Sequence, residues 1–195
     1  MQRLHLDVAM QRLYRRHSLI TALYTGTFDP VHYGHLDLIE RGAVLFDKLI
    51  VAVYDHKLPT KSLLFSVDER VGMIKEALRD TQSENITITQ FSGLAVDFAH
   101  EVNAQVFVRG LRVFSDFEFE FRLALANKRL APDIETISLI TQEDHTFLSG
   151  TTVREIASLG GDVSSMVSPN VAEALYNRFN GNSPNPFNRP VPLRD

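Results

Sequence analysis

Residues 19–46 read LITALYTGTFDPVHYGHLDLIERGAVLF, and this stretch decides how the chain folds. Its first six residues are rich in the large apolar and β-branched side chains that favour a buried strand. Residues 36–46 instead carry apolar side chains at helical spacing. Between these two patterns stand Gly26, Pro30 and Gly34, which interrupt regular structure. The stretch therefore predicts a strand, a glycine-containing loop and a helix.

The same alternation of short β-rich runs and helical patterns continues along the chain. It predicts right-handed βαβ crossovers and hence a doubly wound (Rossmann-like) α/β fold, a five-stranded parallel sheet with helices on both faces. Helix starts are indicated by the capping-box spacings Ser66/Glu69 and Ser115/Glu118 and by Ser168 before a proline. The predicted strands are 19–24, 49–54, 86–89, 106–108 and 136–140, and the predicted helices are 36–46, 67–78, 95–102, 117–130, 153–159 and 171–179.

Length and composition limit the class of protein. The 195 residues suit one ordinary domain, which we place at 18–180, between an N-terminal extension (1–17) and a disordered tail (181–195) rich in Pro and Asn. The arginines of the extension would also suit a targeting peptide, but Asp7 and the small number of serines count against that alternative. A net charge of −4 argues against a nucleic-acid binder. The chain has no cysteine and no run of about 18 apolar residues, so we expect a soluble cytoplasmic protein with no membrane segment.

In a doubly wound sheet, ligands bind beyond the carboxyl ends of the strands, where the strand order reverses. The loops after the first and fourth strands are therefore the expected site. In the first of them, TGTFDPVHYGH (25–35), the glycines permit close backbone approach and the helix start offers free amides to an anion. His32 and His35 could hold a metal, could be structural, or could donate a hydrogen bond to a phosphate as charge builds there. We favour the last role, for His35.

The loop after the fourth strand contains Arg109-Gly110-Leu111-Arg112, followed by DFEFE (116–120). Two arginines at the carboxyl end of a strand can each bind a phosphate through a planar fork of donors. A solvated pair of arginines is the alternative. A third polar run, HTFLSGTTVR (145–154), opens a helix whose hydroxyls and free amides could bind the β- and γ-phosphates of a nucleotide, although Ser149 could equally be an ordinary N-cap.

The pattern G-x-F-D-P-x-H-x-G-H resembles the signature of the nucleotidyltransferase superfamily, and R-G-L-R with D-F-E-x-E resembles the pantetheine-phosphate adenylyltransferases in particular. This resemblance spans about residues 19–179. It implies transfer of AMP from ATP to 4'-phosphopantetheine, giving dephospho-coenzyme A and pyrophosphate, in a hexamer. Feedback by coenzyme A is implied in the same way. We also expect Mg²⁺ with ATP, held mostly by substrate oxygens and water, because no dense carboxylate cluster appears, and we predict no metal ligand in the protein.

The resemblance also implies a role for each residue that matches the family's motifs. Thr27 and Phe28 would contact ATP and the acceptor, and His35 would steady the α-phosphate as the catalytic residue. Lys61, Arg109 and the backbone at Ala95 would bind the acceptor. The nucleotide would be bound by Gly110, Leu111, Arg112, Glu120, His145, Thr146, Phe147, Leu148, Ser149, Gly150 and Thr151.

Four positions depart from the family's pattern or keep a second interpretation. Lys57 competes with Lys61, because the loop reads HKLPTK rather than P-S-K-K-P. Gly150 replaces a serine and His145 replaces an aromatic residue, which affects one phosphate hydrogen bond and adenine stacking. Glu120 could also be an exposed helix acid. Other functions left open are a nucleotidyltransferase with a different acceptor, a nucleotide-binding sensor without activity, and a nucleic-acid-binding module.

Overall fold

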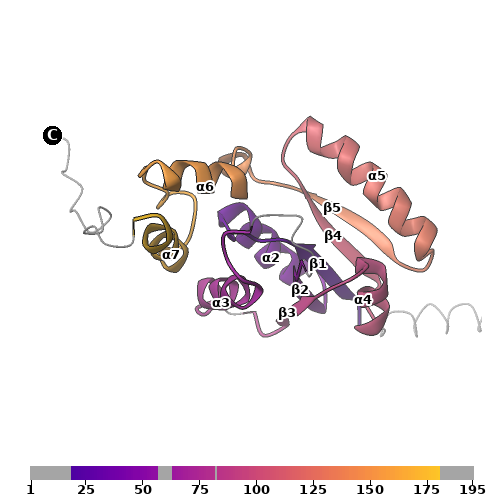
Figure 1. Cartoon of the computed structure of the whole chain (residues 1–195). Coiled ribbons are helices and arrows are strands. Elements are labelled where there is room, and N and C mark those ends of the chain that lie inside the picture. The colour runs from indigo at the N-terminus through magenta and orange to yellow at the C-terminus, as the bar shows by residue number, and fades with distance from the viewer. Residues whose placement is uncertain (1–18, 57–62, 82, 181–195) are drawn as a thin grey trace, which may run out of the picture.

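The computed structural model describes residues 19–56, 63–81 and 83–180. Five parallel strands form one sheet in the order β3-β2-β1-β4-β5, with helices on both sides (Figure 1). This confirms the doubly wound α/β prediction; the predictions for residues 1–17 and 181–195 lie outside the described ranges. The elements are β1 (Thr21–Gly26), α2 (Tyr33–Leu45), β2 (Lys48–Tyr54), α3 (Val67–Ala77), β3 (Ile86–Phe91), α4 (Ala95–Glu101), β4 (Val106–Leu111), α5 (Phe114–Leu130), β5 (Glu135–Ile140), the short 3₁₀ helix η1 (Glu143–His145), α6 (Gly150–Ser158) and α7 (Pro169–Asn180).

The strand order reverses between β1 and β4. The chain runs outward from β1 through β2 to β3, then returns across the sheet to place β4 against the other side of β1. A crevice opens beyond the carboxyl ends of two such strands, because the connections that leave them cross to opposite faces of the sheet. The two predicted ligand loops follow β1 and β4, so they meet at this edge.

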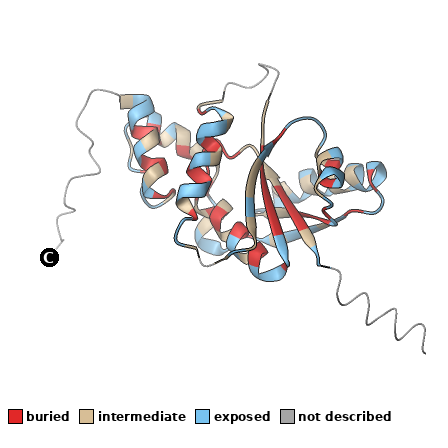
Figure 2. Cartoon of the chain, turned by 90° about the horizontal axis from the view of Figure 1, so that it is seen from below, coloured by how far each residue is buried: buried red, intermediate tan, exposed pale blue. Residues whose placement is uncertain are grey.

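Two apolar clusters pack on the two faces of the sheet (Figure 2). Successive strand residues point to opposite faces, so Ala22 and Tyr24 of β1 join one cluster while Leu23 joins the other. Helices α2, α3, α6 and α7 cover the first face, and α4 packs on the second. Burial on both faces explains why the central strands are continuously apolar.

The observed helix starts can be compared with the capping residues predicted from the sequence. Ser66 caps α3 as predicted: its hydroxyl accepts the Glu69 backbone N–H and the Glu69 carboxylate accepts the Ser66 N–H. Helix α7 begins directly after Ser168, also as predicted. The predicted start of α5 was wrong, because the helix begins at Phe114, which places Ser115 inside the first turn. None of the helices in the described ranges is long and apolar enough to cross a bilayer.

Candidate active site

A cavity of about 390 Å³ opens at the carboxyl ends of β1 and β4. Its walls come from the two loops that the sequence singled out, from the first turn of α2, from α5, and from the start of α6. The lining residues are Tyr24, Thr25, Gly26, Phe28, His32, Gly34, His35, Leu38, Arg109, Gly110, Arg112, Asp116, Phe119, Glu120, Thr141, Ser149 and Gly150.

The loop after β1 folds tightly around the Phe28 ring. Phe28 has φ 50°, a left-handed conformation that residues with a side chain rarely adopt. Its buried ring contacts the Tyr24 and His35 rings edge-on, at centroid distances of 5.4 and 4.9 Å. A Cβ on Gly26 would lie 2.8 Å from the Phe28 ring, so this position requires glycine. The G-x-F motif thus brings a glycine backbone and an aromatic ring beside His35.

The imidazoles of His32 and His35 stack at a centroid distance of 3.6 Å. The Nδ1 atom of His35 accepts the backbone N–H of His32 at 3.3 Å, so in the neutral ring the proton sits on Nε2. Burial, His32 and the nearby Arg112 hold the pKa of His35 well below its usual value of 6.5. His35 is therefore a neutral hydrogen-bond donor at the cavity wall. In this protonation state, His35 can donate its Nε2–H to a phosphate oxygen as negative charge develops there.

Acid should destabilise the wild type more steeply than a His32→Asn variant. Burial, Arg112 and His145 lower the pKa of folded His32 from 6.5 to about 3, whereas the unfolded chain takes up this proton near pH 6.5. Stability present above pH 6.5 is therefore lost as the pH falls toward 3, by about 1.4 kcal/mol per unit. Asparagine suits the N-cap position that His32 occupies. Urea titrations from pH 4 to 7 give the two slopes, and equal slopes would contradict this account.

Arg109 and Glu120 form a bidentate ion pair inside the cavity. The guanidinium Nε and Nη2 each lie 2.7 Å from a Glu120 oxygen, and Nη1 donates to the Thr25 carbonyl at 3.1 Å. The two side chains are only 19% and 12% exposed. Burial by itself would lower the pKa of Arg109, but the hydrogen bond and charge of Glu120 more than offset it and raise that pKa. Glu120 is therefore not an exposed helix acid.

Arg112 is held in the same way by Asp116. Its Nε and Nη2 lie 2.9 and 3.1 Å from the two carboxylate oxygens, and its Nη1 donates to the Leu148 carbonyl at 2.6 Å. Despite partial burial, which acts to raise it, the pKa of Asp116 is lowered by these Arg112 contacts. Asp116, in the first turn of α5, also accepts the Arg112 backbone N–H at 3.2 Å. Arg112 thus joins the loop after β4 to the segment before α6.

Helix α6 points its N-terminus at this cavity. Ser149 is the N-cap, and its hydroxyl accepts the Thr152 backbone N–H at 3.1 Å. A Cβ on Gly150 would lie 3.1 Å from the Asp29 carbonyl oxygen. The glycine that departs from the family's serine therefore lets α6 approach the loop after β1 closely. The free amides of this first turn remain available for an anion.

The structure brings about half of the predicted site residues into the cavity wall. Those that line it in the described part of the chain are Phe28, His35, Arg109, Gly110, Arg112, Glu120, Ser149 and Gly150. Several others do not line this cavity. His145 lies in η1, where its ring faces that of Tyr33, Ala95 begins α4, and Leu148 is buried with its carbonyl on Arg112. The remaining ones are Thr27 and Leu111, in the loop after β1 and at the end of β4, and Thr146, Phe147 and Thr151, around the start of α6.

Lys57 and Lys61 lie outside the described residues. Sequence reasoning also missed lining residues, notably Asp116, Phe119 and Thr141. Asp116 stands four residues after the oppositely charged Arg112, and this spacing was a signal for their pairing. Thr141 follows the end of β5 directly, and position at the carboxyl end of a strand was its only signal. A side chain in the wall without a charge or motif leaves no trace in a single sequence.

The fold and this site define a class of protein. The sequence pattern of the cytidylyltransferase-like family matches residues 23–156, which contain both ligand loops and the start of α6. The fold is shared with the nicotinic acid mononucleotide adenylyltransferase of Plasmodium falciparum (TM-score 0.54, 16% identity, 84% of this chain and 99% of that one). It is also shared with half of a bifunctional NMN adenylyltransferase/ADP ribose pyrophosphatase of Francisella tularensis (TM-score 0.62, 16% identity, 82% and 49%).

Sequence relatives narrow the class further. Phosphopantetheine adenylyltransferases are 47% identical over 161 residues in Dictyoglomus thermophilum (83% of this chain, 96% of the relative) and 49% identical over 158 residues in Caldanaerobacter subterraneus (81% and 96%). The chain belongs to the phosphopantetheine adenylyltransferase family.

Proposed function

We propose that this chain transfers AMP from ATP to 4'-phosphopantetheine, giving dephospho-coenzyme A and pyrophosphate in coenzyme A biosynthesis. The observation that carries the proposal is the neutral His35 donor, placed with two arginines in one cavity of a chain nearly half identical to phosphopantetheine adenylyltransferases. A phosphate oxygen of the acceptor attacks the α-phosphorus of ATP, a new P–O bond forms, and the bond to the β-phosphate oxygen breaks as pyrophosphate leaves. No protein nucleophile takes part.

We assign the roles from the position of each group. The Nε2–H of His35 donates to an α-phosphate oxygen, where charge builds in the transition state. Arg112 and the free amides in the first turn of α6 bind the β- and γ-phosphates, which leave as pyrophosphate. The positive end of the α6 dipole stabilises their negative charge. Arg109 faces the same cavity and binds the acceptor phosphate. Thr27, Lys61 and the backbone at Ala95 remain proposed contacts of the acceptor.

The two ion pairs restrict how the arginines can bind phosphate. Glu120 and Thr25 occupy most of the N–H groups of Arg109, and Asp116 and Leu148 occupy most of those of Arg112. Each guanidinium is thereby held in one orientation before substrate arrives, which reduces the entropy lost on binding. A phosphate then takes the remaining N–H groups or displaces a carboxylate oxygen.

Mg²⁺ is proposed to enter with ATP. The carboxylates that line the cavity, Glu120 and Asp116, are both engaged by arginines. Within the described ranges, no three His, Asp or Glu side chains come together as a metal site. Phosphate oxygens and water would therefore supply most of the ion's ligands, as Mg²⁺ commonly accepts, and the bound ion would neutralise triphosphate charge.

The experiment that tests the function measures pyrophosphate released from ATP and Mg²⁺. We expect release with 4'-phosphopantetheine and none with nicotinamide mononucleotide or glycerol 3-phosphate. Release with another acceptor would keep the reaction and overturn the substrate. Binding of ATP without turnover on any acceptor would instead favour a nucleotide sensor.

The hexamer implied by the family resemblance is also a proposal, and α5 supports self-association. Phe114, Phe117 and Phe121 form a row of stacked rings on α5 with 91%, 51% and 51% exposure, and Leu125 continues it. An apolar stripe of this size on a surface helix marks an interaction site. A second copy of the chain would cover it.

The location of the enzyme in the cytoplasm likewise stays a prediction.

Light scattering after gel filtration tests the assembly. We expect the wild type to elute as a multimer of the 22.0 kDa chain and a Phe117→Asp/Phe121→Asp variant to elute as a smaller species. The control is Glu76→Gln, an exposed acid on α3 away from this stripe, which should leave the mass unchanged. A monomeric wild type would contradict the proposal.

A further inference from the structure

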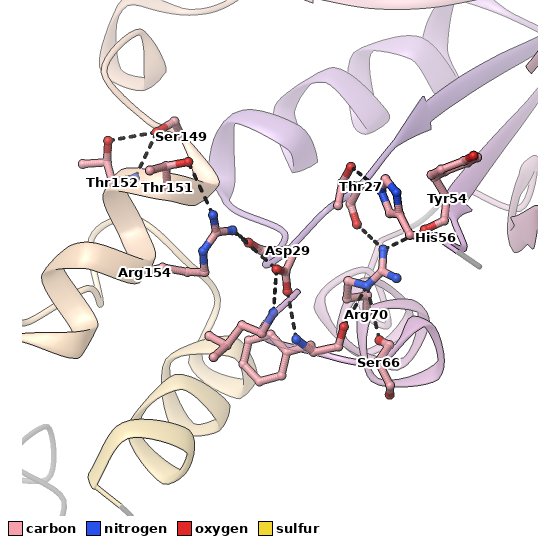
Figure 3. A network of polar contacts seen from close by, with 12 residues as sticks. Thr27, Asp29, Tyr54, His56, Ser66, Arg70, Ser149, Thr151, Thr152 and Arg154 are labelled. Atoms are coloured by element: carbon pink, nitrogen blue, oxygen red, sulfur yellow. Dashed lines mark hydrogen bonds and ion pairs between the residues drawn. The ribbon is translucent and has the colours of Figure 1, made fainter. Parts of the chain in front are cut away.

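Arg70 is a charged side chain in the core that the mechanism above does not use. It stands in the first turns of α3, and only 1% of its surface is exposed. Its guanidinium binds main-chain carbonyls from three segments: Nη1 reaches Thr27 at 2.5 Å and Tyr54 at 3.0 Å, and Nε reaches Phe65 at 3.2 Å (Figure 3). Burying a cation is costly, so these contacts compensate for lost hydration.

Asp29 makes the reciprocal connection from the loop after β1. Its buried carboxylate accepts the backbone N–H groups of Leu64 and Phe65 at 2.8 and 3.0 Å. Arg154 of α6 donates to the carbonyl oxygen of the same residue (Figure 3). Arg70 thus binds the loop from the side of α3, and Asp29 binds back to the segment that precedes α3. We call this pair the Arg70–Asp29 clasp.

The clasp holds the loop on both sides of Phe28. The Thr27 carbonyl is bound by Arg70, and the Asp29 side chain is anchored two residues later. Between them Phe28 keeps φ 50°, a conformation that persists only where the surroundings enforce it. The Phe28 ring in turn lies against His35 at 4.9 Å. Displacing the Thr27 carbonyl would therefore shift the Phe28 ring, which packs against one side of the His35 imidazole.

We propose that Arg70 is a positioning residue for AMP transfer: by binding the Thr27 and Tyr54 carbonyls it holds the loop at Phe28, and through that ring the His35 imidazole, in the reactive arrangement. The inference rests on the proposed function for the role of His35. A lysine keeps the charge but has no planar fork, so it cannot bind all three segments together.

The test compares Arg70→Lys with Ile74→Ala, a change one turn further along the same helix at a fully buried core position. We expect Arg70→Lys to lower kcat on the order of 10- to 100-fold, since small misplacements of reacting groups have such effects, with little change in KM for ATP. Ile74→Ala should lower the melting temperature by at least as much and leave kcat near the wild-type value. A kcat for Arg70→Lys near the wild-type value, or an equal loss in both variants, would overturn the proposal.

A second readout does not depend on turnover. Nitrogen NMR of ¹⁵N-labelled histidine reports which ring nitrogen of His35 carries the proton, and we expect its signals to shift in Arg70→Lys and to stay unchanged in Ile74→Ala. If Arg70→Lys does not fold, Asp29→Asn, which removes the acceptor facing Leu64, replaces it with the same expected outcome. Unshifted signals would refute the link to His35. Absence of wild-type turnover would instead refute the proposed function.

Discussion

Replacing His35 with alanine should lower kcat by about 10²- to 10³-fold, the effect of removing one donor that stabilises transition-state charge. The hydrogen bond from the His32 backbone to Nδ1 leaves the His35 proton on Nε2, at the wall of the cavity. Since this bond to phosphate strengthens mainly in the transition state, KM for ATP should change little. Pyrophosphate release with 4'-phosphopantetheine measures both constants.

The matched control for this variant is His100→Ala. His100 is half exposed on α4, pairs with Asp133, and has no place in the cavity wall. Its removal should leave kcat unchanged.

Because the pKa of His35 lies well below 6.5, we also expect kcat to stay level from pH 6 to 8 rather than follow a group that titrates near 6.5. A rise in kcat on acidification through that range would show that a protonated histidine is the active form.

Breaking the Arg109–Glu120 ion pair should have the largest effect on the free energy of unfolding. A Glu120→Leu variant leaves a mostly buried guanidinium without its carboxylate, and we expect the free energy of unfolding to fall by about 3 kcal/mol. Urea denaturation monitored by circular dichroism measures the change. Glu118→Gln serves as the control, because its salt bridge to Arg122 is largely exposed and should contribute under about 1 kcal/mol.

The double variant Arg109→Met/Glu120→Leu separates stability from activity. Removing both charges together relieves the unpaired cation, so the double variant should be within about 1 kcal/mol of the wild type. It should nevertheless bind the acceptor poorly, because Arg109 supplies the proposed phosphate contact. A double variant as unstable as Glu120→Leu would mean that packing rather than charge is lost. Recovered activity would remove Arg109 from the site.

Apolar spacing, together with the positions of glycine, proline and capping residues, predicted the type of each main element. The five strands and six helices were recovered because apolar spacing in the chain reflects which faces each element buries. Their bounds shifted: β1 begins at Thr21 rather than Leu19, and α2 extends back to Tyr33. Ends depend on local hydrogen bonds that apolar spacing does not record. The predicted parallel order already places both ligand loops at one edge of the sheet.

The partners of the charged groups were decided only by the tertiary structure. The sequence presented Arg109 as a ligand of the acceptor and Arg112 and Glu120 as ligands of the nucleotide, whereas the fold pairs Arg109 with Glu120 across 11 positions and Arg112 with Asp116. Arg70 belongs to no motif and only falls within the predicted helix 67–78, yet in the structure it binds the Thr27 carbonyl, 43 positions away.

What the sequence by itself determined is the strand–loop–helix order and the location of the site, because both depend on local patterns and on a fixed rule of sheet topology. Which carboxylate neutralises which guanidinium, and which cation is buried, depends on side chains brought together from distant segments. That is a property of packing, and a linear pattern does not contain it.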